Sequence, residues 1–293
     1  MDLKSYLSAQ RERVDAALDS AIPTAEVLPS KMHKAMRHSI FAGGKRLRPI
    51  LCLTAAEALG ADNGDALPAA CSLEMLHTFT LIHDDLPCMD DDDFRRGKPT
   101  CHKIYGEAVA VLAGDALQSL AFEVLCNLPR EARYQPCDFV RELAVASGSL
   151  NVVAGQVLDL EGEGKDLSFD DLRAIHERKT AALLAVSLRF GAMAGGATTK
   201  ELEALTDFGK NLGLAFQVID DILDTTQTSE KLGKTAGKDE AVGKATYPAI
   251  LGLDASREEA KRLTADAKDA LSILGDRGSR LLAIADYMLD RDY

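Results

Sequence analysis

The chain has 293 residues, of which 46% are hydrophobic and 27% charged, so it is expected to be a globular protein of one large or two small domains. This balance excludes a collagen-like or wholly disordered chain. Acidic residues (46) outnumber basic ones (34), and the formal net charge of −12 argues against a nucleic-acid partner bound through bulk charge.

Six cysteines are spread along the chain without a C-x-x-C pair, which predicts reduced, mostly buried thiols in a cytoplasmic protein. Residues 1–6 lead into a charged amphipathic stretch without an apolar region, so no signal peptide is expected. No run of about 18 uninterrupted apolar residues occurs, and we therefore expect no stable membrane insertion.

Apolar residues, mainly alanine and leucine, recur at helical spacing along nearly the whole chain. Helix starts are expected near Ser168, Thr198 and Ser256, because an acid follows each of them three residues later, as in a capping box. Short breaks separate the helices, and the longest irregular stretch, residues 225–247, is expected to form a mobile loop. The sequence thus predicts an all-α fold in which residues 1–293 form a single domain of about ten mostly antiparallel helices.

The first polar cluster is the aspartate-rich segment 84–97, which follows an apolar helical run. Pro87 is expected to end the helix and let the chain turn, so that Asp90 faces back toward Asp84. Clustered carboxylates repel one another unless a cation neutralises them. Oxygen ligands without partner His or Cys residues favour a hard ion such as Mg²⁺. Taken alone, the segment also fits an acidic surface loop.

The second polar cluster, Asp220, Asp221 and Asp224, lies among apolar residues more than a hundred positions later. Asp220 and Asp224 are four residues apart, so they share a helix face, and Gln217 falls on the same face one turn earlier. Two such clusters, each rising from an apolar helix, are much less frequent by chance than one. We therefore expect them to form opposite walls of a metal-filled cavity.

Cations suited to an anionic ligand accompany both clusters. Residues 43–49 combine two glycines, three cations and a proline just before an apolar helix, and a helix N-terminus attracts anions. His77 lies two helical turns before Asp84 and shares its face. The alternatives are a solvated basic turn for residues 43–49 and a satisfied core histidine for His77.

Together these clusters predict Mg²⁺ bound between two carboxylate walls, with cations around a deep apolar space. A diphosphate that carries a hydrocarbon tail is the ligand that suits this arrangement. Metal ions and cations would bind the diphosphate, and Ala- and Leu-rich helices would enclose the tail. The negative net charge does not oppose this, because the bound ions supply the local positive field.

Segments 43–49, 84–100 and 220–224 together resemble the motifs of the trans-isoprenyl diphosphate synthases, over nearly the whole chain. The bacterial farnesyl diphosphate synthase type is the most similar, because it also carries two extra residues, here within residues 86–89. The resemblance implies helices around a central cavity and a homodimer. It also implies Mg²⁺-dependent head-to-tail condensation of isopentenyl diphosphate with dimethylallyl or geranyl diphosphate to give farnesyl diphosphate.

The resemblance further assigns roles to individual residues. About three Mg²⁺ ions are expected on three metal ligands, Asp84, Asp90 and Asp220. The other residues expected to be catalytic are Asp85, Asp221, Asp224 and Lys179. Those expected to bind isopentenyl diphosphate are Lys45, Arg48, His77 and Arg96. Those expected to bind the allylic diphosphate are Arg95, Lys179, Thr180, Gln217, Lys234 and Lys244.

Product length is expected to depend on Phe79 and Thr80, which lie about one turn before Asp84 on the same helix. One turn rises about 5.4 Å, close to the length of an isoprene unit, so the ring of Phe79 is expected to form a floor that stops growth at C15. In the family that the chain resembles, farnesyl-producing enzymes of this type also carry an aromatic residue here. Longer-product relatives carry a smaller or flexible one.

Four alternatives differ in what they require of the sequence. A geranylgeranyl diphosphate synthase differs only in where elongation stops. A terpene cyclase has no use for Lys45, Arg48 and His77. A metal phosphohydrolase, suggested by the pair His83 and Asp84, needs further His ligands. A non-catalytic synthase subunit needs no intact aspartate motifs.

Overall fold

The structure is a computed structural model that describes residues 2–62, 64–129, 133–226 and 245–289. Two of the expected diphosphate ligands, Lys234 and Lys244, lie outside these residues, as does most of the predicted loop 225–247.

The described part of the chain is mostly helical, and the predicted all-α fold is confirmed. Its α-helices are α1 (Leu3–Ala21), α2 (Ser30–Ile40), α3 (Leu47–Ala58), α4 (Leu67–Asp84), α5 (Cys101–Tyr105), α6 (Glu107–Leu125), α7 (Pro136–Ser147), α8 (Val152–Gly162), α9 (Phe169–His176), α10 (Ala182–Ala194), α11 (Thr199–Thr226), α14 (Tyr247–Leu251), α15 (Leu253–Ala270) and α16 (Ser279–Leu289). A π-helical turn, η1 (Glu177–Ala181), joins α9 to α10, and a 3₁₀ segment, η2 (Leu271–Gly278), joins α15 to α16.

Two of the three predicted helix starts are correct. Ser168 caps α9, where the hydroxyl oxygen and the carboxylate of Asp171 form the reciprocal capping box. Thr198 accepts from the N–H of Glu201 in the same way at the start of α11. The start predicted at Ser256 is wrong, because this residue lies inside α15 and its hydroxyl donates to the carbonyl of Gly252 one turn earlier.

The structure contains a small hairpin that the sequence does not predict. Strands β1 (Phe94–Arg95) and β2 (Lys98–Pro99) pair antiparallel. The two residues between them, Arg96 and Gly97, have φ angles of 54° and 73°, which is the mirror-image turn that suits two-residue hairpins. Strands of two residues are too short to leave an alternating pattern in the sequence.

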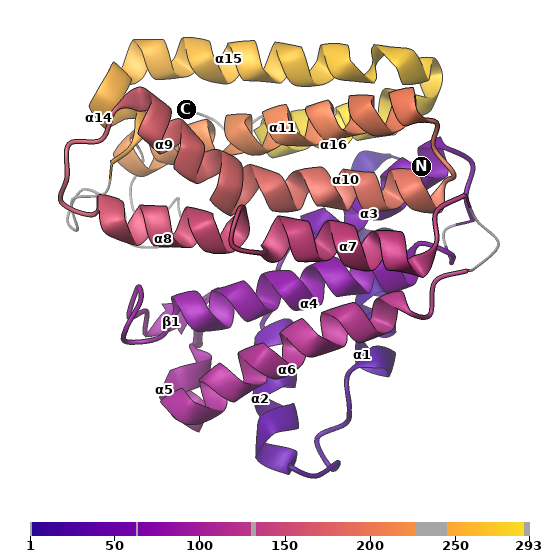
Figure 1. Cartoon of the computed structure of the whole chain (residues 1–293), viewed down its shortest axis with the longest axis vertical. Coiled ribbons are helices and arrows are strands. Elements are labelled where there is room, and N and C mark those ends of the chain that lie inside the picture. The colour runs from indigo at the N-terminus through magenta and orange to yellow at the C-terminus, as the bar shows by residue number, and fades with distance from the viewer. Residues whose placement is uncertain (1, 63, 130–132, 227–244, 290–293) are drawn as a thin grey trace.

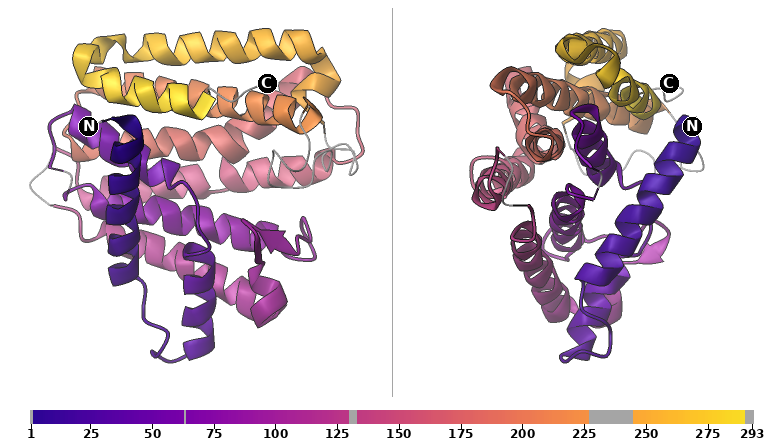
Figure 2. Two further views of the ribbon diagram at one scale, coloured as in Figure 1. Left: turned by 180° about the vertical axis from the view of Figure 1, so that it is seen from behind. Right: turned by 90° about the vertical axis from the view of Figure 1, so that its right-hand side faces the viewer.

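Helices α4 and α11, which carry the two aspartate clusters, run in the same direction through the bundle. In Figure 1 both run from right to left and end on the side where β1 lies, and the reverse view in Figure 2 agrees. Helix α10 packs antiparallel against α11, so η1, which precedes α10, lies at the same end. The fold therefore brings three segments that are far apart in the sequence to one end of the molecule.

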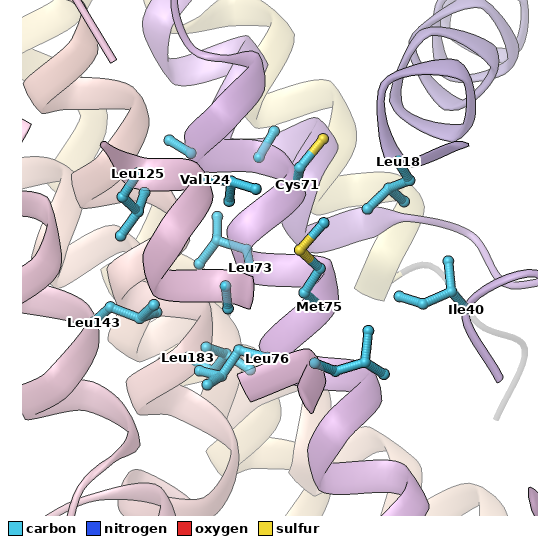
Figure 3. Packing of buried hydrophobic residues seen from close by; sticks show 14 of the residues in the cluster. Leu18, Ile40, Cys71, Leu73, Met75, Leu76, Val124, Leu125, Leu143 and Leu183 are labelled. Atoms are coloured by element: carbon cyan, nitrogen blue, oxygen red, sulfur yellow. The ribbon is translucent and has the colours of Figure 1, made fainter. Parts of the chain in front are cut away.

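Two apolar layers hold these helices in place, and α10 contributes to both. Its residues Leu183, Val186 and Phe190 face the layer around α4, whereas Leu184 and Leu188 face the layer around α11. A helix that is apolar on all sides is expected to be buried between neighbours in this way. Figure 3 shows part of the first layer, with Leu18, Ile40, Leu73, Met75, Leu76, Val124, Leu143 and Leu183 converging around α4.

All six cysteines are free, as predicted, but only Cys52, Cys71 and Cys101 are buried. By length and composition, the helical stretches 107–125 and 136–162 could cross a membrane, with 39% and 28% of their windows buried. This is a weak indication, because core helices of soluble proteins pass the same test.

Candidate active site

Asp84 is the last residue of α4, and the chain turns back immediately after it. The backbone N–H of Asp90 donates to the carbonyl of Asp84 at 2.8 Å, and the N–H of Asp91 donates to the carbonyl of Leu86 at 3.1 Å. Asp91 adopts the left-handed conformation, with a φ of 46°, which closes the turn. The main chain thus returns Asp90 to Asp84, as predicted from Pro87.

The carboxylate of Asp84 lies in an unfavourable electrostatic environment. Its pKa is raised from 3.8 to about 6, mainly by burial; Asp90 and Asp85 also raise it, whereas Lys179 and Arg95 lower it. The pKa of Asp85 is also raised, again mainly by burial. The nearby protein cations therefore do not fully compensate Asp84, and a bound cation would be favoured here.

Asp85 and Arg95 form an ion pair at the base of the hairpin. Nε and Nη2 of Arg95 lie 2.7 and 2.6 Å from Oδ1 of Asp85, and the carboxylate is buried. The hairpin turn brings Arg95 back over the end of α4. Asp85 thus holds an arginine that was expected to bind the allylic diphosphate.

The cations expected to bind isopentenyl diphosphate come together only in part. Arg48 lies 3.4 Å from Nε2 of His77, and both are half-buried. Burial, together with Arg48, Arg96 and other cations, holds the pKa of His77 well below its ordinary value. The pKa of Arg48 is lowered to about 10, mainly by burial. Arg96 also lowers it, whereas Glu74 raises it. The buried Nε of Arg48 has no hydrogen-bond partner among the described residues, so this N–H can donate to a bound anion.

The guanidinium of Arg96 contacts the backbone of the two glycines Gly43 and Gly44, close to Arg48 and His77. One of its guanidinium nitrogens donates to the carbonyl of Gly43. A Cβ at Gly44, whose φ is 128°, would lie 2.6 Å from that nitrogen. The positive φ therefore favours glycine at this position, and a side chain here would also displace the guanidinium of Arg96.

The two cations between Gly44 and Arg48 have different surroundings. Arg46 is 3% exposed and donates to Asp15, Glu74 and the carbonyl of Ile40, so it holds the loop in place. Lys45 is exposed and lies over the ring of Tyr287, with its Nζ 5.6 Å from the ring centroid. The structure thus does not place Lys45 in contact with Arg48 and His77.

Lys179 lies within the π-helical turn η1, and Asp159 of α8 holds it at 2.5 Å. Helix α8 approaches closely because Gly155 faces η1, where a Cβ would lie 2.4 Å from the backbone nitrogen of Lys179. Single π-turns are often found at functional sites. Sequence reasoning missed Asp159, although its spacing of four from Gly155 places both on one face of α8.

The second aspartate cluster joins a hydrogen-bonded network. Oδ1 of Asp221 accepts from Nε2 of Gln217 at 3.0 Å, and Oε1 of Gln217 accepts from the hydroxyl of Thr180 at 3.2 Å. Oδ2 of Asp221 accepts from the backbone N–H of Tyr247 at 3.0 Å, with Nε2 of His176 at 3.8 Å. The network brings Thr180, Gln217 and Asp221 together. Asp220 is half-buried and Asp224 is buried on the same helix.

Phe79 faces the seam between α4 and α6. Its ring packs edge-on against His83 with centroids 4.8 Å apart, and Nε2 of His83 lies 3.1 Å from the carbonyl of Val111 on α6. Five residues correspond to a rotation of about 140° around a helix, so Phe79 and Asp84 lie on different faces of α4. The hydroxyl of Thr80, which is nearer the Asp84 face, donates to the carbonyl of His77 at 2.8 Å.

Among the described residues, no group of three His, Cys, Asp or Glu side chains could hold a metal ion by itself. Mg²⁺ is usually held by one or two carboxylates together with substrate phosphates and water rather than by an all-protein cage. The oxygen-only donors of both aspartate clusters suit the same ion.

A family model described as polyprenyl synthetase matches residues 29–272. The chain belongs to this family. The family as a whole generally uses Mg²⁺. The predicted resemblance is therefore correct at the level of the family.

Relatives of known name agree with this membership. The chloroplastic heterodimeric geranylgeranyl pyrophosphate synthase large subunit 1 of Arabidopsis thaliana is 52% identical over 99% of this chain and 80% of its own length. The chloroplastic geranylgeranyl pyrophosphate synthase of Capsicum annuum is 50% identical over 99% and 79%. The apo structure of an FPP/GFPP synthase from Zymomonas mobilis superposes with a TM-score of 0.88 at 34% identity, covering 98% of both chains. The names of the plant relatives favour the geranylgeranyl alternative over the farnesyl type.

The predicted cytoplasmic location is contradicted by these comparisons, because the plant relatives are named as chloroplastic. The prediction rests on the lack of an apolar secretion segment and on reduced cysteines. Neither feature separates the cytoplasm from a plastid, because transit peptides are amphipathic and have no apolar core segment.

Proposed function

We propose that this chain joins isopentenyl diphosphate head to tail to an allylic diphosphate in a Mg²⁺-dependent reaction. The observation that carries the proposal is the juxtaposition of Asp84 with Lys179 at the end of the bundle where α11 also ends. A half-buried carboxylate whose pKa is raised to about 6 lies there within the field of a fixed lysine. Such a site suits a ligand that brings both negative charge and divalent cations.

Asp84, Asp90 and Asp220 are the carboxylates that we assign to about three Mg²⁺ ions, shared with diphosphate oxygens. When bound, Mg²⁺ neutralises the charge that develops on the leaving diphosphate. Lys179, held by Asp159, places a fixed positive charge beside the same leaving group. We assign Asp85 the different task of holding Arg95.

The two diphosphates are proposed to bind on opposite sides of the Asp84 cluster. Isopentenyl diphosphate is assigned to Arg48, Arg96 and the neutral ring of His77, because the two guanidinium groups lie close to this ring and form no ion pair with an acid among the described residues. The allylic diphosphate is assigned to Lys179, Thr180 and Gln217 around η1 and α11. Lys234, Lys244 and Arg95 complete the allylic set by resemblance, and Lys45 is the least supported member of the first set.

In the proposed reaction the bond between the allylic carbon and the diphosphate oxygen breaks, which leaves an allylic cation. The double bond of isopentenyl diphosphate attacks this cation and forms the new carbon–carbon bond. The resulting cation then loses a proton, and the released diphosphate is the proposed base. The reaction requires that water be kept from the site, because water would otherwise capture the cation.

We propose geranylgeranyl diphosphate (C20) as the main product, because relatives about 50% identical to this chain carry that name. The orientation of Phe79 toward His83 and α6 also weakens its role as a floor directly below Asp84. Farnesyl diphosphate (C15) remains the second candidate, because the aromatic residue at position 79 favours it. Chromatography of the dephosphorylated products made from isopentenyl diphosphate, each allylic diphosphate and Mg²⁺ tests both proposals. Absence of any elongated product would overturn the function, and a C15 end point would overturn the C20 assignment.

We also propose that a second copy of the chain covers the face formed by α6, α7 and α8. Large apolar side chains are exposed along this face: Val111, Leu112, Val145, Val153, Val157 and Leu158. The three helices lie toward the viewer in Figure 1 and along one edge in the right-hand view of Figure 2. Exposed apolar surface of this kind marks an interface.

Light scattering during size-exclusion chromatography tests this proposal. We expect a dimer for the wild type and a monomer for Val157→Asp. Ile273→Asp, which places the same charge at an exposed apolar position on η2, is the matched control and should stay dimeric. A monomeric wild type would overturn the proposal.

A further inference from the structure

Asp221 directs both of its carboxylate oxygens to donors within the protein. Gln217 of the same helix donates to Oδ1, and the backbone N–H of Tyr247 donates to Oδ2, both at 3.0 Å. The residue is 4% exposed, so little of the carboxylate faces the site. A metal ion would have to compete with two hydrogen bonds in a buried position.

Tyr247 is the first residue of α14 and is fully buried. Its ring stacks on His176, with centroids 5.5 Å and planes 18° apart, and Phe169 packs against it edge-on at 5.9 Å. The hydroxyl has no hydrogen-bond partner among the described residues. The ring therefore contributes packing, and the polar contact made by Tyr247 with α11 is its backbone N–H. The first N–H groups of a helix have no acceptor within it, and Asp221 supplies one.

Gln217 extends the network toward the proposed substrate site. Its amide nitrogen is directed to Asp221, which leaves its amide oxygen to accept from Thr180 on η1 at 3.2 Å. Thr180 follows Lys179 directly in the π-turn. Asp221 thus determines which end of the Gln217 amide faces Thr180, and it links α14, α11 and η1.

We propose that Asp221 is a positioning residue rather than a metal ligand. It ties the first turn of α14 to α11 and orients Gln217 and Thr180 toward the allylic diphosphate. The first part is independent of the reaction, whereas the second part rests on the proposed function.

The first part is tested on the metal-free protein in EDTA with Asp221→Asn. An asparagine has one acceptor oxygen for two donors, so one donor is left unsatisfied. We expect Tm to fall by about 2–8 °C. Hydrogen exchange should rise at least about tenfold at the amide of Tyr247, because this amide loses its acceptor. Asp84→Asn is the matched control, and it should not lower Tm, because it removes a charge from a repelling cluster.

Gln217→Met provides a second variant in case Asp221→Asn fails to fold. It removes one partner of Asp221 but leaves the contact with Tyr247, so we expect a smaller loss of Tm and unchanged exchange at the Tyr247 amide. An Asp221→Asn protein with wild-type Tm and wild-type exchange at Tyr247 would overturn the proposal. So would a loss of Mg²⁺ binding, measured by calorimetry with a non-hydrolysable diphosphate, equal to that of Asp84→Asn.

The second part is tested by kinetics of the same variant. We expect Asp221→Asn to raise KM for the allylic diphosphate about tenfold, with KM for isopentenyl diphosphate within about twofold of the wild-type value. An equal rise in both KM values would overturn the orienting role while leaving the tie to α14 intact. If the wild type condenses nothing, the proposed function fails, and the stability and exchange results still decide the first part.

Discussion

At the end of α4, the main chain brings Asp84 and Asp90 together, whereas at the end of α11 the carboxylate of Asp221 is held by donors. The first pair is joined by a backbone hydrogen bond between residues 84 and 90, and burial raises the pKa of Asp84 to about 6. Asp221 is more deeply buried, but an amide and a backbone N–H meet its two oxygens.

The comparison shows that two similar aspartate motifs have different surroundings. Burial and nearby carboxylates make the ionised form of a carboxylate unfavourable until a cation binds. Such a carboxylate is therefore suited to be a metal ligand. A buried carboxylate that accepts hydrogen bonds from fixed donors stabilises the surrounding structure instead. Within one motif, then, neighbouring aspartates are expected to divide between ligand and scaffold.

The largest effect is expected from removing a proposed metal ligand. Asp84→Ala and Asp220→Ala should each lower kcat by at least about 100-fold, because charge stabilisation of the leaving group is lost. The metal-free Asp84→Ala protein should melt no lower than the wild type. Steady-state assays in Mg²⁺ and thermal melts in EDTA check both statements. Near wild-type turnover would show that the carboxylate is not a ligand.

A smaller effect on catalysis is expected from the basic segment 43–49, in which Arg48 and Lys45 have different surroundings. Arg48→Ala should raise KM for isopentenyl diphosphate about 10–100-fold, because a charge-assisted contact with phosphate contributes roughly 1.5–3 kcal/mol. Lys45→Ala should raise it less, since Lys45 lies over Tyr287. Initial rates at varied isopentenyl diphosphate measure the difference. A larger effect on the allylic substrate would mean that the two sites are interchanged.

The chain-length prediction concerns the other face of α4. Phe79→Ala should lengthen the product beyond that of the wild type if the ring limits the pocket, and it should leave the product unchanged if the ring only packs against His83 and α6. Because Phe79 is half-buried, the loss of stability should stay below the roughly 3–5 kcal/mol of a fully buried Phe. Chromatography of the product alcohols and urea unfolding provide the two measurements.

The smallest effect is a pH dependence in the metal-free protein. Because the folded state raises the pKa of Asp84 from 3.8 to about 6, the carboxyl is protonated in both states below about pH 4 and the shift then costs nothing. The cost appears between about pH 4 and 6 and is complete above that range. The Tm of Asp84→Asn minus that of the wild type should therefore be near zero at about pH 4 and rise by a few degrees by about pH 7. A difference that is constant with pH would contradict the raised pKa.

The sequence is sufficient for features that depend on spacing along a helix. Apolar periodicity predicts the all-α fold, and the spacing along α11 places Gln217 on the face of Asp220 and Asp224. The structure adds a hydrogen bond from Gln217 to Asp221 that the sequence analysis does not predict. Pro87 and the glycine pair indicate where the chain turns, since these residues restrict or widen the backbone angles locally.

Tertiary structure decides which partners these side chains find. Asp159 reaches Lys179 from another helix, and Tyr247 reaches Asp221 across 26 residues, so no local pattern reveals either contact. The opposite surroundings of Lys45 and Arg46, adjacent in one motif, likewise follow from neighbours distant in the sequence. Spacing along a chain determines the helix face on which a residue lies, but packing between helices determines which residues that face contacts. The pKa and the hydrogen bonds of each aspartate depend on those contacts.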